Sequence, residues 1–298
     1  DWYRSRGLGD VYKRQHNCML QAGVIGCGHL GKFHIKQLSE SKRYQLSGVY
    51  DKDLDIARVV SKEFNCDFFD NSDDLIKISD VICIVTPTPF HFTYAKECIA
   101  SDVHVFIEKP VCDNLNDSNE LIQLNKKRNL KIQVGHIERF NPAFTSIKNK
   151  INNPMFIESH RLAQFNPRGT DVSVVLDLMI HDIDIILSSV DSEIKKISSS
   201  GVSVISSTPD IANARIEFEN GCVANLTASR VSIKNMRKTR FFQTGKYISI
   251  DFLNKSSEII EIDNNSNEVP LMKLDLADGS TKNIFFSKPN IKENNAIL

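Results

Sequence analysis

One short run constrains the fold more than any other part of the chain: Gly23 to Gly31, which reads GVIGCGHLG. The run overlaps the end of the apolar segment 19–25, which is expected to be a buried strand, and Gly26, Gly28 and Gly31 follow that strand. In a strand–turn–helix unit the first glycine of G-x-G-x-x-G makes a tight turn, and the second lets backbone N–H groups approach a pyrophosphate at the positive helix end. The third lets the helix pack on the strand. The spacing therefore predicts a dinucleotide site at Gly26, Cys27, Gly28, His29, Leu30 and Gly31.

An acidic residue, Asp51, directly follows the next apolar run, at the spacing from the glycine turn at which a ribose-binding carboxylate is expected. Residues 45–50 predict a second strand, which ends at Asp51, 20 residues after Gly31. A carboxylate at this position accepts hydrogen bonds from ribose hydroxyls and repels a ribose phosphate. Asp51 therefore favours NAD as the cofactor, and the neighbouring Lys52 keeps NADP open. The alternative is that Asp51 starts a turn with Lys52 and Asp53.

Length and composition predict an ordinary globular protein with room for two domains. The chain has 298 residues, of which 41% are hydrophobic and 25% charged. Its 37 basic and 37 acidic side chains leave no net charge, which argues against binding to nucleic acid or to an anionic membrane. No apolar run reaches the roughly 18 residues of a membrane helix, and no signal peptide precedes the first strand. We therefore expect a cytoplasmic protein.

The seven cysteines have irregular spacing and no C-x-x-C motif. This pattern argues against a disulfide framework and against a metal site, so none is expected. Cysteines of this kind are typical of small buried apolar residues in a reducing compartment. Cys27, within the glycine turn, is the candidate for modification.

Both ends of the chain differ from the rest. Residues 1–15 contain the single Trp and show no periodicity, so residues 1–17 are interpreted as a non-native extension. At the other end, residues 292–298 are typical of the first turn of a helix that has been cut off. Residues 1–15 are left out of the fold prediction.

Between these ends the pattern predicts an α/β protein with two domains. Residues 18–140 alternate apolar runs with amphipathic segments, which indicates a doubly wound parallel sheet. Residues 141–298 show strands of period two, as at Ile211 to Arg230 with a hairpin turn at Asn220-Gly221. This second domain is predicted to be α/β, with a mostly antiparallel open sheet and one prominent helix. The first domain should contain strands near 20–25, 45–50, 80–85, 103–107 and 131–135, and helices near 30–40, 53–64, 90–100 and 116–127.

The tripeptide Glu108-Lys109-Pro110 directly follows the strand 103–107. Lys109 thus lies at the carboxyl end of a sheet strand, where open α/β sheets bind their ligands. Proline restricts the exit from the strand and so the direction of the lysine. The alternative is an exposed lysine that pairs with Glu108.

Residues 172–190 are expected to be helical, with Thr170 or Asp171 as the cap. Asp177 and His181 are four residues apart and so share one face. A carboxylate there can accept the imidazole N–H and leave the other ring nitrogen to take a proton near neutral pH. The alternative is a histidine satisfied in the core. Two further acids of this helix are expected to be solvated or interfacial: Asp182 and Asp184.

The segment 134–143, VGHIERFNPA, joins the two domains. Its glycine and its proline-stopped turn suit either the wall of a cleft or a plain hinge. In the first case Arg139 is available to an anion, and Asn141 lies beside it as a substrate-binding candidate.

Two further groups are candidates for ligand contacts. Thr86, Pro87 and His91 follow a strand end, where the nicotinamide half would lie in a doubly wound sheet, or else they form a simple turn. A basic cluster is either a solvated strip or, if it faces the cleft, a site for a diphosphate. It comprises Arg230, Lys234, Arg237, Lys238 and Arg240.

Four motifs in order resemble the Gfo/Idh/MocA family over nearly all of residues 19–298. They are GVIGCGHLGKFH, T-P-x-x-x-H at 86–91, E-K-P at 108–110 and D-x-x-x-H at 177–181. The resemblance implies a Rossmann domain, a C-terminal α/β domain that covers the nicotinamide, binding of NAD or NADP, and homodimers or homotetramers. It places Lys109 and His181 at the catalytic lysine and histidine positions and adds Glu108 and Lys109 to the cofactor contacts.

The resemblance also implies a reaction. Nicotinamide would take a hydride from a sugar carbinol, while His181, oriented by Asp177, takes the hydroxyl proton and Lys109 stabilises the alkoxide. Substrate contacts are expected from these three residues and from Arg139, Asn141 and Arg230. VGHIERFNPAF and VLDLMIHDIDIIL resemble members that oxidise the 3-hydroxyl of UDP-N-acetylglucosamine for lipid A synthesis. Alternatives are an inositol, a free sugar or a biliverdin-like substrate, or a regulator that senses NAD(P).

Overall fold

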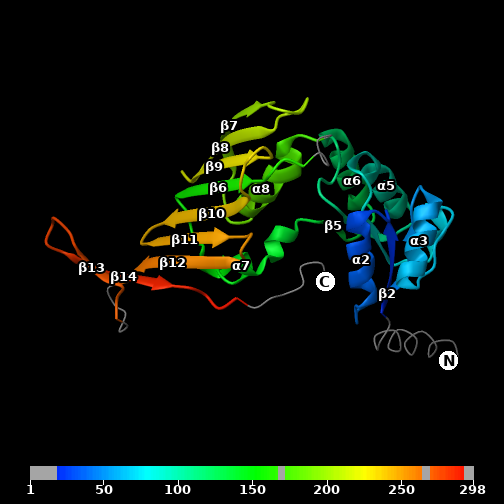
Figure 1. Ribbon diagram of the computed structural model, residues 1–298, viewed down its shortest axis with the longest axis horizontal. Coiled ribbons are helices and arrows are strands. Elements are labelled where there is room, and N and C mark those ends of the chain that lie inside the picture. Colours follow the sequence, from blue (N-terminus) through cyan, green and yellow to red (C-terminus); the bar gives the residue numbers. More distant parts are fainter. Residues whose placement is uncertain (1–18, 167–171, 264–268, 292–298) are drawn as a thin grey trace, which may run out of the picture. The chain divides into compact units, whose positions relative to one another are not determined.

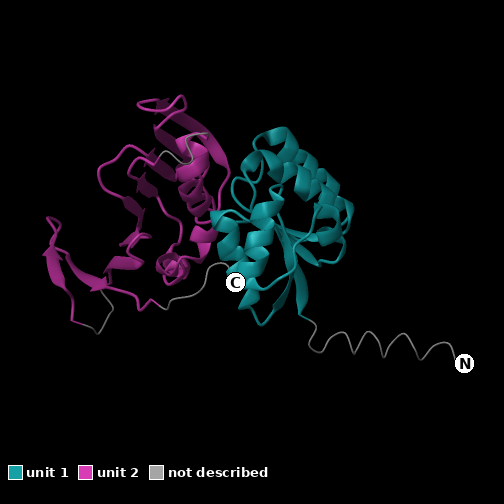
Figure 2. Cartoon of the chain, turned by 45° about the vertical axis from the view of Figure 1, so that its right-hand side comes forward, with its two compact units in different colours: residues 1–135, 297–298 teal, residues 136–296 magenta. Residues whose placement is uncertain are grey.

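The computed structural model describes residues 19–166, 172–263 and 269–291. These residues form two compact units, 19–135 and 136–291, which Figure 2 colours separately and which are described here one by one. Several sequence-based expectations lie outside the described residues: the extension 1–17, the cap at Thr170 or Asp171, and the cut-off helix 292–298.

Unit 1 is built on a parallel sheet of five strands in the order β2-β1-β3-β4-β5 (Figure 1). The predicted doubly wound parallel sheet is therefore confirmed. Its strands are apolar on both faces because helices cover both sides, and Ile82 and Ile84 are fully buried. The strands are β1 (Leu20–Ile25), β2 (Tyr44–Tyr50), β3 (Val81–Ile84), β4 (His104–Ile107) and β5 (Ile132–Val134).

The helices of unit 1 begin where short polar side chains cap them. Asp53 accepts hydrogen bonds from the backbone of Asp55 and Ile56 at the start of α3, and Asn71 and Asn114 cap α4 and α6. The six-residue α4 was not expected, since it is too short to show a helical period. The helices are α2 (His29–Ser39), α3 (Leu54–Phe64), α4 (Ser72–Lys77), η1 (Thr88–Phe90), α5 (His91–Ala100) and α6 (Leu115–Lys126).

Unit 2 contains a sheet of nine strands in the order β13-β14-β12-β11-β10-β6-β9-β8-β7 (Figure 1). All its neighbours are antiparallel except β6 and β9, which confirms the mostly antiparallel sheet. The strands are β6 (Phe156–Leu162), β7 (Ile194–Val202), β8 (Ile211–Phe218), β9 (Val223–Ser229), β10 (Met236–Gln243), β11 (Lys246–Asp251), β12 (Ser256–Ile262), β13 (Met272–Asp275) and β14 (Thr281–Ser287).

Helices pack on one face of this sheet and bury alternate residues. On β8 the buried side chains are Ala212, Ala214, Ile216 and Phe218, as the period of two predicted. Helix α8 contacts β6 and β9, and α7 contacts β11 and β12. The helical elements are η2 (Ile137–Phe140), α7 (Pro142–Thr145), η3 (Lys148–Lys150), the π-helix η4 (Val175–Met179) and α8 (Ile180–Leu187).

Two details differ from the sequence-based expectations. The helix expected over 172–190 begins as the π-helix η4 and continues as α8. The division between the units falls after Gly135 rather than after residue 140. Residues 136–140 belong to unit 2 because Glu138 and Arg139 form ion pairs with Arg161 and Asp184.

Candidate functional site

The glycine turn lies between β1 and α2, and backbone geometry requires glycine at two of its positions. Gly26 has φ +106°, and a Cβ there would lie 2.5 Å from the carbonyl oxygen of Val85. A Cβ at Gly31 would overlap the carbonyl oxygen of Gly26. Gly28, in contrast, faces open space, which leaves its backbone accessible to a phosphate. Each glycine thus has the surroundings that a dinucleotide turn needs.

Asp51 is fixed beside this turn. One carboxylate oxygen accepts the N–H of Cys27 at 2.7 Å, and the other accepts the N–H of Asp53 at 2.9 Å. These two bonds hold the carboxylate at the end of β2, next to the end of β1, because the two strands are parallel neighbours. The side chain therefore belongs to the dinucleotide site as well as to the turn that it starts.

A cavity of about 680 Å³ opens at this edge of the sheet. Thr86 Oγ1 is a buried atom that receives no hydrogen bond from any described group, so a ligand hydroxyl or phosphate could satisfy it. Lys52 Nζ lies 5.6 Å from the centre of the Phe90 ring. These residues fit a dinucleotide. The lining is Ile25, Gly26, Gly28, Asp51, Lys52, Asp53, Val85, Thr86, Pro87, Phe90 and Tyr94.

Two predicted cofactor contacts have other roles in the structure. The Cys27 thiol is buried, and desolvation raises its pKa to about 12, so the expectation of a modifiable thiol is wrong. His91 is 1% exposed, and its ring nitrogens lie 2.8 Å from the carbonyl oxygens of Pro110 and Thr86. The imidazole therefore joins the loops after β3 and β4, and it is not on the surface of the cavity.

Lys109 is half-buried at the end of β4, as its place after the strand predicted. Its neighbour Glu108 is 7% exposed, and its carboxylate lies 2.8 Å from Nε2 of His34 on α2. The alternative of an exposed Glu108–Lys109 surface pair is therefore excluded. Sequence reasoning missed His34, although it ends the segment GVIGCGHLGKFH and lies on the buried face of α2.

Asp177 and His181 lie in unit 2, in η4 and α8 respectively, and both are half-buried. π-helical turns inside helices occur frequently at functional sites. The N-terminal side of this helix is held by three bonds, since Val172 O accepts from Arg230 and Thr208 and the N–H of Val174 donates to Pro209 O. Lys109 belongs to unit 1, so its convergence with His181 remains a prediction.

Asp182 and Asp184, which were expected to be solvated or interfacial, are not solvated but buried between elements of unit 2. Asp182 is 3% exposed and pairs with both Nε and Nη2 of Arg161, at 2.9 and 3.0 Å. Asp184 is 7% exposed and forms two 2.6 Å bonds with Arg139. These bidentate pairs attach η2 and β6 to α8. The side chain of Arg139, expected to meet an anion, is thus already paired, although 46% of it stays exposed.

Asn141 and Arg230 also have structural partners. The Asn141 amide donates to Glu138 Oε2 and to Phe252 O, and its oxygen caps α7 through the N–H of Ala143. Its donors and its acceptor are therefore used within unit 2. Arg230 is 4% exposed and donates to Val172 O at 2.6 Å, so its guanidinium is held within unit 2, and its contact with substrate stays a prediction.

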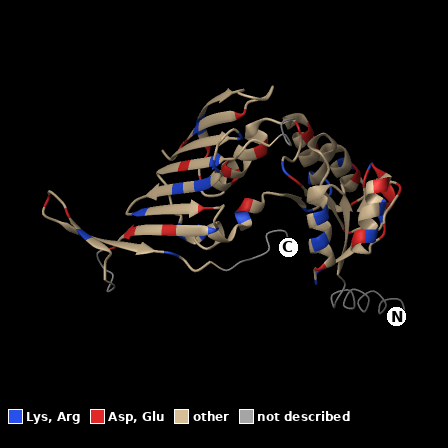
Figure 3. Ribbon diagram, in the orientation of Figure 1, with Lys and Arg blue, Asp and Glu red and all other residues tan. Residues whose placement is uncertain are grey.

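The basic cluster at 230–240 does not converge on one point. Arg237 lies 3.6 Å from Glu138 of η2, on the helix-covered face of the sheet. Lys238 and Arg240 alternate with it along β10 and pair with Asp251 and Glu158. Figure 3 shows that basic and acidic positions are spread over several strands of this sheet. The alternation of the strand separates Arg237 from Lys238 and Arg240, which favours the alternative of a charged strip over that of a diphosphate site.

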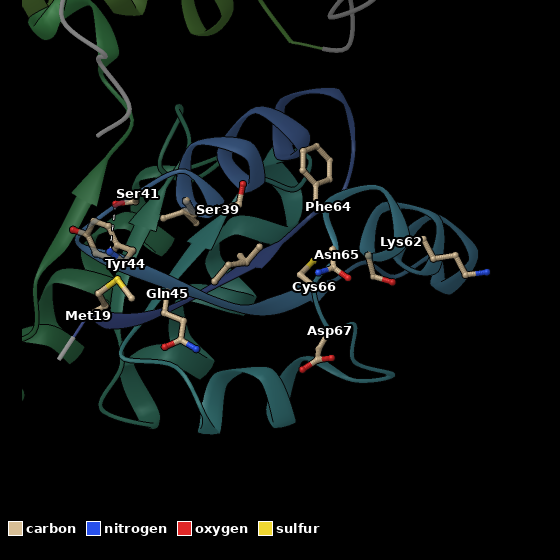
Figure 4. Close-up of a pocket in the computed structure, with 13 residues that line it drawn as sticks. Met19, Ser39, Ser41, Tyr44, Gln45, Lys62, Phe64, Asn65, Cys66 and Asp67 are labelled. Carbon is tan, nitrogen blue, oxygen red and sulfur yellow. Dashed lines mark hydrogen bonds between the residues drawn. The ribbon is translucent and has the colours of Figure 1, made fainter. Parts of the chain in front are cut away.

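A second hollow in unit 1 has a volume of about 640 Å³ (Figure 4). It lies where β1 and β2 begin and where α2 and α3 end, with Met19, Tyr44, Ser39 and Asn65 in its wall. The glycine turn and Asp51 are at the other ends of these strands. This hollow is therefore separate from the dinucleotide site. Among the described residues, no helix has the length and apolar character needed to cross a membrane.

Taken together, the parallel sheet, the glycine turn and the fixed Asp51 define a dinucleotide-binding protein with a second α/β unit. The family model of oxidoreductases with an NAD-binding Rossmann fold matches residues 20–136, and that of the GFO/IDH/MocA C-terminal domain matches residues 149–247. The chain belongs to the Gfo/Idh/MocA family. It is therefore an NAD-binding oxidoreductase, as the four motifs predicted.

Individual relatives agree with this assignment. UDP-N-acetylglucosamine 3-dehydrogenase of Acidithiobacillus ferrooxidans is 38% identical over 241 residues, which are 80% of this chain and 76% of that protein. The solved structure of that enzyme, GnnA, has a TM-score of 0.84 at 34% identity and covers 94% of this chain and 86% of its own. The scyllo-inositol 2-dehydrogenase (NAD(+)) of Bacillus subtilis is 28% identical over 72% of this chain and 68% of its own length.

Proposed function

We propose that this protein oxidises the 3-hydroxyl of UDP-N-acetylglucosamine in an NAD-dependent reaction. The main support for this substrate is the 38% identity, over 80% of the chain, to a protein named for this activity. The assignment of NAD as the cofactor is supported by the glycine turn and by the cavity of about 680 Å³ that Asp51 lines. When bound, NAD supplies the hydride acceptor.

Three side chains perform the remaining chemistry in this proposal. Asp177 accepts one imidazole N–H of His181 and so selects the ring nitrogen that takes the proton of the sugar hydroxyl. Lys109 donates to the same oxygen and stabilises the negative charge that develops on it. Arg139 adds a contact to the nucleotide part through the exposed portion of its guanidinium.

We place the product of the enzyme in lipid A synthesis, in the cytoplasm, and expect a homodimer or homotetramer. Support for these points comes from the resemblance of the motifs. The mass of the assembly, measured by light scattering, tests the oligomer.

Substrate choice is tested by mixing the protein and NAD with UDP-N-acetylglucosamine, inositol or glucose and measuring the absorbance of reduced nicotinamide. UDP-N-acetylglucosamine should give NADH, while inositol and glucose give little or none. Turnover of inositol alone would assign the chain to the activity of its inositol-oxidising relatives. Binding of NAD without turnover of any candidate would favour a regulator.

Two substitutions test the proposed roles. Lys109→Met and His181→Ala should each lower kcat by about 10²- to 10⁴-fold, because each removes a group that acts on the reacting oxygen. The Kd of NADH, measured by fluorescence titration, should stay unchanged. Lys234→Met is the control, since Lys234 is exposed in unit 2. A loss of NADH binding in either variant, with kcat preserved at saturation, would contradict these roles.

A further inference from the structure

The residue on each side of Lys109 is held by a buried histidine. Before the lysine, Glu108 Oε1 accepts a 2.8 Å hydrogen bond from Nε2 of His34, which is 2% exposed. After it, the carbonyl oxygen of Pro110 lies 2.8 Å from Nδ1 of His91, which is 1% exposed. The two histidines come from different helices, α2 and α5. The lysine is thus the centre of a short segment with two fixed neighbours.

The Glu108 carboxylate acts on Lys109 directly. Its second oxygen, Oε2, accepts the backbone N–H of Lys109 at 3.2 Å. The N–H of Glu108 itself donates to Ile84 O on β3. The carboxylate therefore joins the backbone of the lysine to His34 at the end of β4.

The space for this carboxylate depends on Gly135. A Cβ at residue 135 would lie 2.9 Å from Oε2 and 3.1 Å from Oε1 of Glu108. The N–H of Gly135 also donates to Ile107 O at 2.7 Å. The carboxylate is thus enclosed by α2, β4 and the end of β5. A buried charge of this kind is retained only where partners hold it.

We propose that His34 and Glu108 are positioning residues that orient Lys109 for the reaction, a role that rests on the proposed function of Lys109. Helix α2 begins at the glycine turn, so the same helix that faces the dinucleotide also supplies the imidazole behind the lysine. The pair therefore fixes Lys109 relative to the cofactor. Glu108 serves the site through this bond.

The test compares His34→Leu with His34→Gln in the full chain, with NAD and UDP-N-acetylglucosamine. The leucine removes the donor to Glu108, whereas the glutamine amide can place an N–H near the position of Nε2. Leu38→Ala, at another buried position of α2 that is 7% exposed, is the matched control for stability. Each variant is measured for kcat, KM, NADH affinity and Tm.

We expect His34→Leu to lower kcat by about 10- to 100-fold, since a small displacement of a catalytic group has such an effect. NADH affinity should change by less than about threefold. His34→Gln should recover most of kcat, and Leu38→Ala should lower Tm without lowering kcat. A purely structural pair would instead give equal kcat for His34→Leu and Leu38→Ala, and no recovery with glutamine.

Amide hydrogen exchange gives a readout that does not depend on turnover. In His34→Leu, exchange should rise in peptides that contain the Lys109 N–H and stay unchanged in those of β1 and β3. Unchanged exchange at Lys109 would overturn the positioning role, whether or not UDP-N-acetylglucosamine is turned over. Normal turnover by Lys109→Met would instead overturn the proposed function of Lys109.

Discussion

Asp51 accepts two backbone N–H groups, those of Cys27 and Asp53, and each of its oxygens retains lone pairs for a ligand. The first bond ties the carboxylate to the glycine turn, and the second begins the turn that leads to α3. Asp51 can therefore both start the turn and accept hydrogen bonds from a ribose, so the two alternatives that the sequence offered do not exclude each other. The same carboxylate faces a cavity that contains Lys52.

This arrangement predicts the effect of Asp51→Ser on cofactor choice. The substitution removes the acceptor for the ribose hydroxyls and the negative charge that repels a phosphate, while Lys52 stays in place. The Kd of NADH should rise about 10- to 100-fold, and that of NADPH should fall. Fluorescence titration measures both constants, with Asp55→Ser as the control outside the cavity. If the Kd of NADH and the Kd of NADPH changed in the same direction by the same factor, Asp51 would have no role in the choice between the two cofactors.

At the scale of elements, the segment from η2 to α7 shows how polar side chains connect pieces of structure. Asn141 caps α7 and also joins it to η2 through Glu138 and to the end of β11 through Phe252 O. A short helix of this kind has little intrinsic stability, so its cap and its packing decide whether it forms. Phe144 of the same helix is fully buried.

Asn141→Ala should therefore destabilise the protein without a specific effect on substrate binding. We expect the free energy of unfolding to fall by about 1–3 kcal/mol, because buried partners lose their hydrogen bonds. The KM for UDP-N-acetylglucosamine should stay within about twofold of its original value. Urea unfolding and steady-state kinetics measure the two quantities, and the exposed Asn149→Ala is the control. A large rise in KM at unchanged stability would restore Asn141 as a substrate contact.

At the scale of the whole molecule, a chain with no net charge concentrates buried charges in unit 2. Arg161 is 2% exposed and bonds both Asp182 and Glu138. Its strand, β6, is central in the sheet, so this one guanidinium connects the sheet with η2 and α8. Burial opposes the charge of Arg161, but the two carboxylates outweigh this effect and raise its pKa.

Arg161→Met should be strongly destabilising, because it leaves the buried Asp182 without its counter-charge and removes from Glu138 the nearer of its two guanidinium partners. We expect a loss of about 3–5 kcal/mol in the free energy of unfolding. Arg240→Met, which breaks a more exposed pair with Glu158, should change stability by about 0–1 kcal/mol. Denaturant unfolding of both variants checks the difference. Equal effects of the two substitutions would show that burial does not control the strength of these pairs.

Local patterns sufficed for much of the fold. The glycine turn after an apolar strand predicted the parallel sheet, and the alternation from Ala212 to Phe218 predicted a sheet with one buried face. The positions of Asp51 and Lys109 at strand ends also followed from the sequence. Such features depend on residues that are near each other in the chain, where periodicity and turn chemistry act directly.

The tertiary structure decided which polar side chains remain available to a ligand. Arg139, Asn141 and Arg230 have the chemistry of substrate contacts, and each is bonded to a residue or carbonyl far along the chain, although nearly half of the Arg139 side chain stays exposed to a ligand. His34 became visible as a partner of Glu108 only when α2 packed on the sheet and brought the imidazole to the end of β4. The physical reason is that a buried polar group must find a partner, and that partner is chosen by packing between distant segments rather than by local sequence.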